Sequence, residues 1–174
     1  PSDGRAGCGA DCGSNRVFVG GYRMSAIAVI TARGGSKRIP GKNKKEFLGK
    51  PIICYSIEAA LESGLFEEVM VSTDDEEIAE IAKKAGASVP FMRSAKTSDD
   101  YATTDDVLIE VLEEYEKMGR DFAYMACIYP TAPFVTAEKL KEAFRLLKEN
   151  NASGVMPVVR FSFPPQRGMA VKNG

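Results

Sequence analysis

The chain has 174 residues, of which 44% are hydrophobic and 27% are charged, and its 23 basic and 24 acidic side chains give a formal net charge of -1. This balance is typical of one globular domain, at most one and a piece of another, and it disfavours a disordered tail. A general nucleic-acid or membrane-surface binder is normally basic overall, which this chain is not. The sequence contains no histidine, which excludes Ser-His-Asp and Cys-His nucleophile systems and His-ligated zinc within it.

The four cysteines bear on the cellular compartment. Cys54 and Cys127 lie in apolar runs, where a thiol usually acts as a small core residue. Cys8 and Cys12 have a single short spacing with no second pair, which disfavours a zinc site, and the chain is too long and core-rich for a disulfide scaffold. We therefore predict a reducing, cytoplasmic location. No apolar run approaches the roughly 20 residues of a membrane span, so no membrane partner is expected.

Residues 1–23 hold six of the 16 glycines and lack the apolar centre of a signal peptide. We expect them to be a disordered or non-native extension, with a domain over 24–174 that opens at Met24. After Val159 the sequence carries no helical pattern. An α/β domain that stops after a strand looks unfinished, so we expect the domain to be incomplete at its C-terminus.

From residue 26 onward, short β-type runs alternate with longer helical patterns. In chain order, the sequence predicts a strand at 26–31, a helix at 51–63, a strand at 68–72, a helix at 75–85, a short strand at 88–91, a helix at 104–118, a strand at 122–128, a helix at 137–149 and a strand at 154–159.

This alternation predicts an α/β fold, doubly wound, with a mostly parallel sheet and helices on both faces, of the Rossmann-like type. The continuous apolar run A-I-A-V-I-T at 26–31 is typical of a strand buried on both faces. Ligands of such folds bind at the C-terminal ends of the strands. That rule selects the loops 32–43, 73–75 and 129–134, together with 93–103 if the short third strand is parallel.

The loop after the first buried strand reads T-A-R-G-G-S-K-R-I-P-G-K-N. Its glycine pair, Gly34 and Gly35, allows a tight turn and a close approach of backbone N–H groups to phosphate oxygens. The bases that can neutralise phosphate charge within this loop are Arg33, Lys37, Arg38 and Lys42. The sequence therefore predicts a phosphate-binding loop.

This loop departs from the best-known nucleotide motifs. Gly35 and Gly41 enclose five residues and Asn43 follows Lys42, which does not match a Walker loop. A G-x-G-x-x-G dinucleotide fingerprint is also absent. The alternative interpretation is a solvated, basic surface loop, and only the position directly after a buried strand argues against it.

The motif I-x-A-R-G-G-S-K-R-I-P-x-K-N resembles the signature loop of the cytidylyltransferases that activate nonulosonic acids, the CMP-N-acetylneuraminate synthetase family. The resemblance runs from about Met24 to the end of the chain and includes V-S-T-D-D at 71–75, the segment around Arg93, and I-Y-P-T-A-P-F at 128–134. Family members usually read Q-P-T-S-P in the last motif. The tyrosine and the Ala-Pro-Phe found here are similar to the pseudaminic acid branch.

The resemblance implies roles for particular residues. Those that would hold the CTP phosphates and carry catalysis are Arg33 and Lys42. Those that would line the same loop as substrate-binding residues are Gly34, Gly35, Ser36, Lys37 and Asn43, the last near the nucleoside. Those that would contact the rest of the substrates are Arg93 beside the cytidine, Thr104 at the nucleotide, and Tyr129 and Thr131, with Tyr129 facing the acidic sugar.

Several of these residues have simpler interpretations. Arg93 is also compatible with an ordinary loop arginine, and Tyr129 with a side chain that closes the end of its strand. Thr104 fits the N-cap of the helix that follows. Asp74 and Asp75 fit a helix start better than a pair of metal ligands.

The implied reaction is attack of the anomeric hydroxyl of an acidic nine-carbon sugar on the α-phosphorus of CTP, with pyrophosphate leaving. Such transfers depend mostly on positioning and charge neutralisation. Mg2+ is expected with the triphosphate. Family members hold it through a D-x-D pair, which occurs nowhere in this sequence, so we expect those aspartates beyond Gly174 and no metal ligand in this chain. A homodimer is also expected.

Two other classes of function stay open. One is a CMP-sialic acid synthetase or another sugar nucleotidyltransferase. The other is a non-enzymatic nucleotide- or RNA-binding module that uses the basic segment 33–50. The net charge of -1 counts against the RNA binder, so no nucleic-acid partner is expected.

Overall fold

The computed structural model describes residues 18–19, 22–23, 25–36 and 38–160. The chain divides into two compact units, Pro1–Lys141 and Glu142–Gly174. The predicted division at residue 23 stays a prediction, because most of residues 1–23 lie outside the described part of the chain. None of the described helices is both long and apolar enough to cross a membrane.

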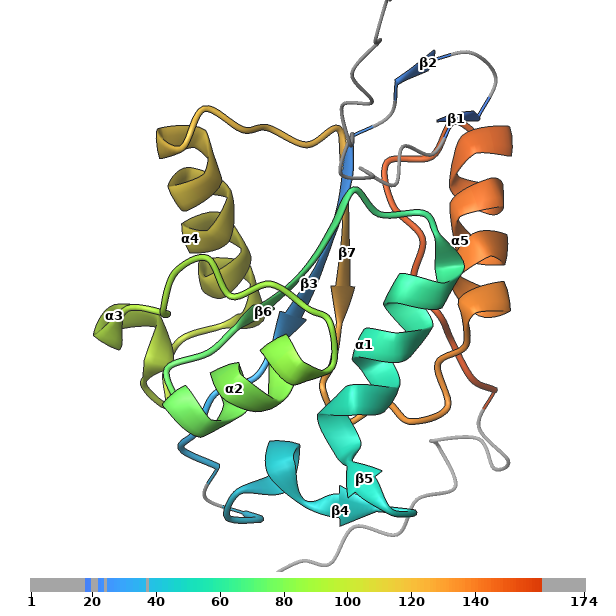
Figure 1. Ribbon diagram of the computed structural model, residues 1–174. Helices are drawn as coiled ribbons and strands as arrows, with labels where there is room; N and C mark the ends of the chain where they lie inside the picture. The colour runs from blue at the N-terminus through green and yellow to red at the C-terminus, as the bar shows by residue number, and fades with distance from the viewer. Residues whose placement is uncertain (1–17, 20–21, 24, 37, 161–174) are drawn as a thin grey trace, which may run out of the picture. The chain divides into compact units, whose positions relative to one another are not determined.

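The main sheet of the described chain is parallel, in the order β6-β3-β7 (Figure 1). Its strands are β3 (Ala26–Thr31), β6 (Glu68–Ser72) and β7 (Tyr124–Ile128). Ile30 of β3 lies opposite Val71 on one side and Ile128 on the other. The C-terminal ends of the three strands therefore meet at one edge of the sheet, as the α/β prediction requires.

Helices alternate with the strands along the chain. Their bounds are α1 (Ile52–Ser63), α2 (Glu76–Lys84), α3 (Ala95–Ser98), α4 (Thr104–Lys117) and α5 (Ala137–Glu149). Within the first unit, α4 lies on one side of the sheet and α1 lies on the other (Figure 1).

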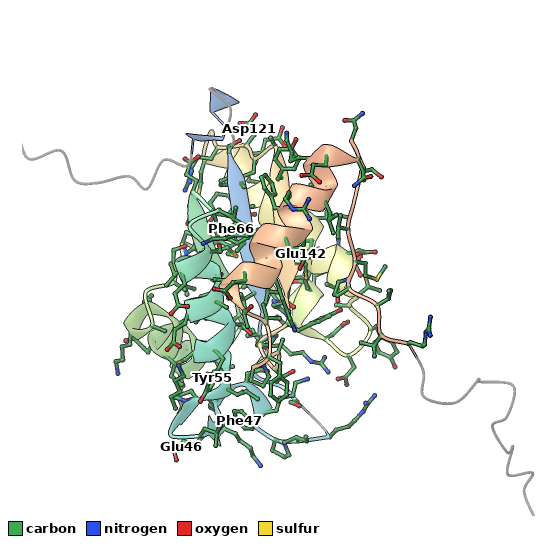
Figure 2. The ribbon with its side chains drawn as sticks, turned by 90° about the vertical axis from the view of Figure 1, so that its right-hand side faces the viewer. Glu46, Phe47, Tyr55, Phe66, Asp121 and Glu142 are labelled. Atoms are coloured by element: carbon green, nitrogen blue, oxygen red, sulfur yellow. The ribbon has the colours of Figure 1, made fainter. Side chains whose placement is uncertain are left out.

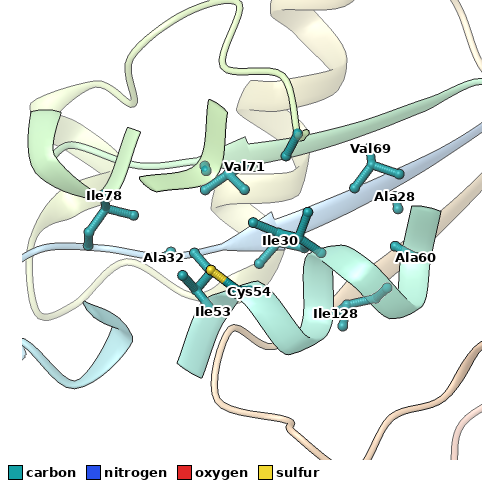
Figure 3. Close-up of a cluster of buried hydrophobic side chains, with 13 residues drawn as sticks. Ala28, Ile30, Ala32, Ile53, Cys54, Ala60, Val69, Val71, Ile78 and Ile128 are labelled. Atoms are coloured by element: carbon teal, nitrogen blue, oxygen red, sulfur yellow. The ribbon is translucent and has the colours of Figure 1, made fainter. Parts of the chain in front are cut away.

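Both faces of β3 are buried. Ala28 and Ile30 belong to a cluster with side chains of α1 and α2, among them Ile53 and Ile78 (Figure 3). Ile27 and Val29 face the opposite way, in a cluster that includes Val111 and Tyr115 of α4. Burial on both faces explains why the strand carries an unbroken apolar run.

A 3-10 turn η1 (Lys42–Lys44) and a small hairpin follow the first loop, with strands β4 (Glu46–Phe47) and β5 (Lys50–Pro51). The Phe47 ring meets the Tyr55 ring of α1 edge-on, with 5.7 Å between centroids (Figure 2). The Tyr55 hydroxyl donates to the Phe47 carbonyl oxygen at 2.7 Å. These contacts hold the hairpin against the first helix.

A second hairpin, β1 (Phe18–Val19) with β2 (Tyr22–Arg23), was not anticipated by the sequence patterns.

Three expectations from the sequence are wrong. The predicted strand at 88–91 is reduced to one bridge between Ser88 and Met70. The predicted strand at 154–159 is absent from the described chain and its residues are exposed, in part because Pro157 cannot donate to a ladder. Cys54 is buried as expected, but Cys127 is exposed on β7.

Candidate functional site

The loops that follow β3 and β7, together with residues between 93 and 107, line a cavity of about 210 Å³ at the C-terminal edge of the sheet. The residues expected to bind substrates that line this cavity are Arg33, Lys42, Asn43, Arg93, Thr104, Tyr129 and Thr131. They come from segments as far apart as residues 33 and 131, so the fold gathers them into one place. This is the edge where ligands of parallel α/β sheets bind.

A second, wider cavity of about 690 Å³ shares Arg33, Lys42, Asp100 and Thr131 with the first. Its lining adds polar and basic side chains, including Ser36, Arg38 and Lys45, and the apolar side chains of Ile39, Phe47 and Ile52. Because Arg33 and Lys42 line both spaces, a ligand that extended from one cavity into the other would pass two cations. That arrangement suits a molecule with a negatively charged centre.

Asn43 is almost completely buried, with 2% of its surface exposed. Its Nδ2 donates to the Arg33 carbonyl oxygen at 2.9 Å, which ties the two ends of the loop together. Its Oδ1 has no hydrogen-bond partner among the residues that the structure describes. A buried acceptor without a donor is costly. Since Asn43 lines the smaller cavity, a ligand donor is a suitable partner for this oxygen.

Arg93 is anchored to the end of β6 and is 8% exposed. Its Nε donates to Ser72 Oγ at 3.0 Å and its Nη2 donates to the Ser72 carbonyl oxygen at 2.6 Å. Burial lowers the pKa of the guanidinium, while the charges of Asp74 and Glu110 act in the opposite direction. Arg93 is thus a buried, hydrogen-bonded arginine at the cavity wall, and its role beside the cytidine stays a prediction.

Arg33 is engaged by the loop that precedes α4. Its Nη1 donates to the Asp99 carbonyl oxygen at 2.7 Å and lies 3.2 Å from Asp100 Oδ1. Both aspartates line the smaller cavity. A carboxylate therefore occupies a position beside Arg33 that an anionic ligand could take.

The other residues of the loop differ in their environments. The Gly34 N–H donates to Asp74 Oδ1 at 2.8 Å, whereas a Cβ added to Gly35 would meet no described atom within 4 Å. Ser36 lines the larger cavity. Lys37 lies outside the described residues, so its predicted role stays a prediction.

The start of α4 corrects one expectation. The N-cap is Thr103, not Thr104, and Thr103 forms a capping box with Asp106. Thr104 Oγ1 instead lies 3.4 Å from the Tyr129 hydroxyl, and Ser56 Oγ donates to the Tyr129 carbonyl oxygen at 2.8 Å. Thr104 and Tyr129 are thus neighbours on the cavity wall. The interpretation of Asp75 as a helix start is confirmed, because its carboxylate accepts from the N–H groups of Glu77 and Ile78.

Sequence patterns did not single out Thr97, Asp99, Asp100 or Thr103, which also line the smaller cavity. The sequence did contain part of the information needed to predict them. The segment 93–103 belongs to the loops at the binding edge, and T-T-D-D places an acidic residue three positions after Thr103, which is the spacing of a capping box. The contact of Arg33 with Asp99 and Asp100 had no local signal, because it joins residues 66 and 67 positions apart.

The fold and this site define an α/β domain of the nucleotidyltransferase type, with a basic loop at the carboxyl edge of a parallel sheet. The cytidylyltransferase family model matches residues 27–165, and the chain belongs to that family. The family resemblance carried by the loop motif is thereby confirmed.

Among its relatives, a pseudaminic acid cytidylyltransferase of Campylobacter jejuni is 44% identical over 144 residues, which cover 83% of this chain and 62% of the relative. A CMP-N,N'-diacetyllegionaminic acid synthase of Legionella pneumophila is 39% identical over 142 residues, or 82% and 61% of the two chains. The chain thus spans about three-fifths of the length of these two relatives.

Solved structures agree with the fold. A CTP complex of CMP:2-keto-3-deoxy-manno-octonic acid synthetase superimposes with a TM-score of 0.61 at 26% identity. The match covers 74% of this chain and 49% of that structure.

Proposed function

We propose that this chain carries the CTP-binding part of a cytidylyltransferase that joins the CMP group of CTP to a nonulosonic acid, with pseudaminic acid favoured, and releases pyrophosphate. The observation that carries the proposal is the cavity in which the buried side chains of Asn43 and Arg93 lie next to the cations Arg33 and Lys42. The Campylobacter jejuni relative, named as a pseudaminic acid cytidylyltransferase, supports the choice of sugar.

In this proposal the nucleoside occupies the smaller cavity, where Asn43 Oδ1 can accept from a donor of the ligand and Arg93 can donate. The α-phosphate lies at the junction of the two cavities, between Arg33 and Lys42. The sugar acid approaches past Tyr129 and Thr131, so that its anomeric hydroxyl attacks the α-phosphorus while pyrophosphate leaves. Fixed cations beside the transferred group favour this step because they stabilise the charge that develops on its oxygens.

Mg2+ is proposed as the partner of the triphosphate, bound as Mg·CTP. In the described part of the chain, no group of three or more histidine, cysteine, aspartate or glutamate side chains is placed to hold a metal ion. The Asp100 carboxylate, which lines both cavities, is paired with Arg33. The described residues therefore do not fit a resident metal site.

The test is a calorimetric titration of the chain with CTP, UTP, ATP and GTP in the presence of Mg2+. Selective binding of CTP is expected. Equal binding of all four nucleotides would contradict a cytidylyl site and favour another sugar nucleotidyltransferase. Binding of none by a folded chain would overturn the proposal for this chain.

The choice of sugar has a separate test, which measures pyrophosphate release from CTP with pseudaminic acid, N-acetylneuraminate and diacetyllegionaminic acid. We expect pseudaminic acid to give the highest kcat/KM. The second candidate is a legionaminic or sialic acid substrate, which the 39% identity to the Legionella pneumophila synthase favours. A homodimer and a cytoplasmic location also stay predictions.

A further inference from the structure

The phosphate loop is fastened to the start of α2 along both of its limbs. On the incoming limb, the Gly34 N–H donates to Asp74 Oδ1 at 2.8 Å. On the outgoing limb, Lys44 Nζ lies 3.4 Å from Asp75 Oδ2 and also pairs with Glu77. Between the limbs, Asn43 Nδ2 donates to the Arg33 carbonyl oxygen. Arg33 and Lys42 therefore sit on a loop whose path is set by contacts outside it.

The loop approaches the start of α2 so closely that position 34 requires a glycine. A Cβ built on Gly34 would lie 2.8 Å from both Cβ and Oδ2 of Asp75, which real Cβ atoms do not tolerate. Asp75 cannot easily withdraw, because its Oδ1 accepts from the N–H groups of Glu77 and Ile78 at 2.8 and 3.1 Å and so caps α2. The close contact with Asp75 therefore explains the glycine at position 34.

Asp74 has a position that capping does not explain, because Asp75 already caps the helix. Its carboxylate accepts from Gly34, and its charge also acts on Arg93 across the cavity wall. A negative charge beside a site for an anion opposes binding by simple electrostatics. Two interactions oppose that cost: its charge acts to raise the pKa of the buried Arg93 guanidinium, and its Oδ1 accepts from the Gly34 N–H and can hold the loop.

We propose that Asp74 is a positioning residue, whose Oδ1 holds the Gly34 N–H and thereby sets the incoming limb that places Arg33 against the phosphates. The inference rests on the proposed function for the identity of the anion. It makes a prediction that separates geometry from charge, because asparagine keeps the acceptor oxygen and removes the charge, whereas alanine removes both.

The experiment compares Asp74→Ala, Asp74→Asn and the control Glu76→Ala, which removes an acidic side chain from the first turn of the same helix. Calorimetry with CTP and with inorganic tripolyphosphate measures the Kd in each variant. We expect Asp74→Ala to weaken both ligands about tenfold, the equivalent of about 1.4 kcal/mol, which is close to the lower limit for a hydrogen bond to a charged group. Asp74→Asn should match or exceed wild-type affinity, and so should Glu76→Ala.

The Gly34 amide gives a readout that needs no ligand. In 15N-resolved NMR spectra, its hydrogen exchange should be slow in the wild type and in Asp74→Asn and fast in Asp74→Ala. Equal weakening by Ala and Asn would overturn the proposal, since the charge and not the acceptor would then matter. Unchanged binding in Asp74→Ala would also overturn it. A wild type that binds neither ligand but keeps the Gly34 amide protected would contradict the proposed function and leave only the hydrogen bond confirmed.

Discussion

Arg33 and Lys42 carry the main electrostatic argument for the site, because both line the two cavities and neither is buried in the core. Replacing either with alanine should weaken CTP binding by about 1.5–3 kcal/mol, the usual range for hydrogen bonds to charged groups. The measurement is a calorimetric titration. Lys84→Ala, at the last turn of α2, is the matched control for loss of one positive charge. If all three variants behave alike, the loop is only part of a diffuse basic surface.

Asp100 is placed where it would compete with an anionic ligand for Arg33, since its Oδ1 lies 3.2 Å from Arg33 Nη1. The pair is partly exposed, at 33% and 39% of the two side chains, so its strength is limited to about 0.2–1 kcal/mol. Asp100→Asn should therefore tighten CTP binding slightly, and more at low salt than at high salt. Calorimetric titrations with CTP at increasing salt concentration test this expectation. Weaker binding in the variant, seen only with Mg2+, would instead make the carboxylate a contact of the metal–nucleotide complex.

Among the elements, those buried on both sides could be predicted from the sequence and those without partners could not. β3 could be recognised as a buried strand from its unbroken apolar run, because it packs against helices on both faces. The run at 154–159 looks similar by composition, but Val158 and Val159 are 87% and 90% exposed. A strand needs a neighbour to pair with, and local sequence does not say whether one is there. The same limit applies to the contact between Asp74 and Gly34, which joins residues 40 positions apart.

At the start of α4, two adjacent threonines both line the smaller cavity but have different partners. Thr103 caps the helix together with Asp106, whereas Thr104 faces the Tyr129 hydroxyl. Thr103→Ala should lower the free energy of unfolding by about 1 kcal/mol, as other lost N-caps do. Thr104→Ala should leave stability nearly unchanged and weaken CTP binding. Thermal unfolding and calorimetry on the same two variants test this separation, and a pattern with the roles reversed would contradict the assignment.

Across the first unit as a whole, the binding edge of the sheet has a counterpart at the opposite end of β6. There Glu68 Oε1 accepts from Ser88 Oγ and from the Tyr115 hydroxyl, both at 2.6 Å, and its other oxygen pairs with Arg120. These contacts join the start of β6, an edge strand of the described sheet, to α4 and to the segments after α2 and α4. The polar network therefore fastens the core at the end where no ligand is expected.

This network predicts how stability depends on pH. Burial alone would raise the pKa of Glu68, but the hydrogen bonds from Ser88 and Tyr115 and the charge of Arg120 outweigh it and lower the pKa. A carboxyl whose pKa is lower in the folded state stabilises the fold above its unfolded pKa, about 4.3. That contribution is lost as the pH falls through the lowered value.

Glu68→Gln should accordingly destabilise the unit at neutral pH by about 1–3 kcal/mol, because it weakens hydrogen bonds to a charged group that is mostly buried. It should also flatten the loss of stability as the pH falls from neutral to below about 4.3, the unfolded pKa, because the wild-type carboxylate is protonated more readily in the unfolded chain. Urea unfolding across that pH range measures both effects. Glu67→Gln is the matched control, since Glu67 lies 3.8 Å from the same Arg120 but is 37% exposed. Two variants with superimposable curves would show that a surface charge, and not the buried network, sets the acid stability of this unit.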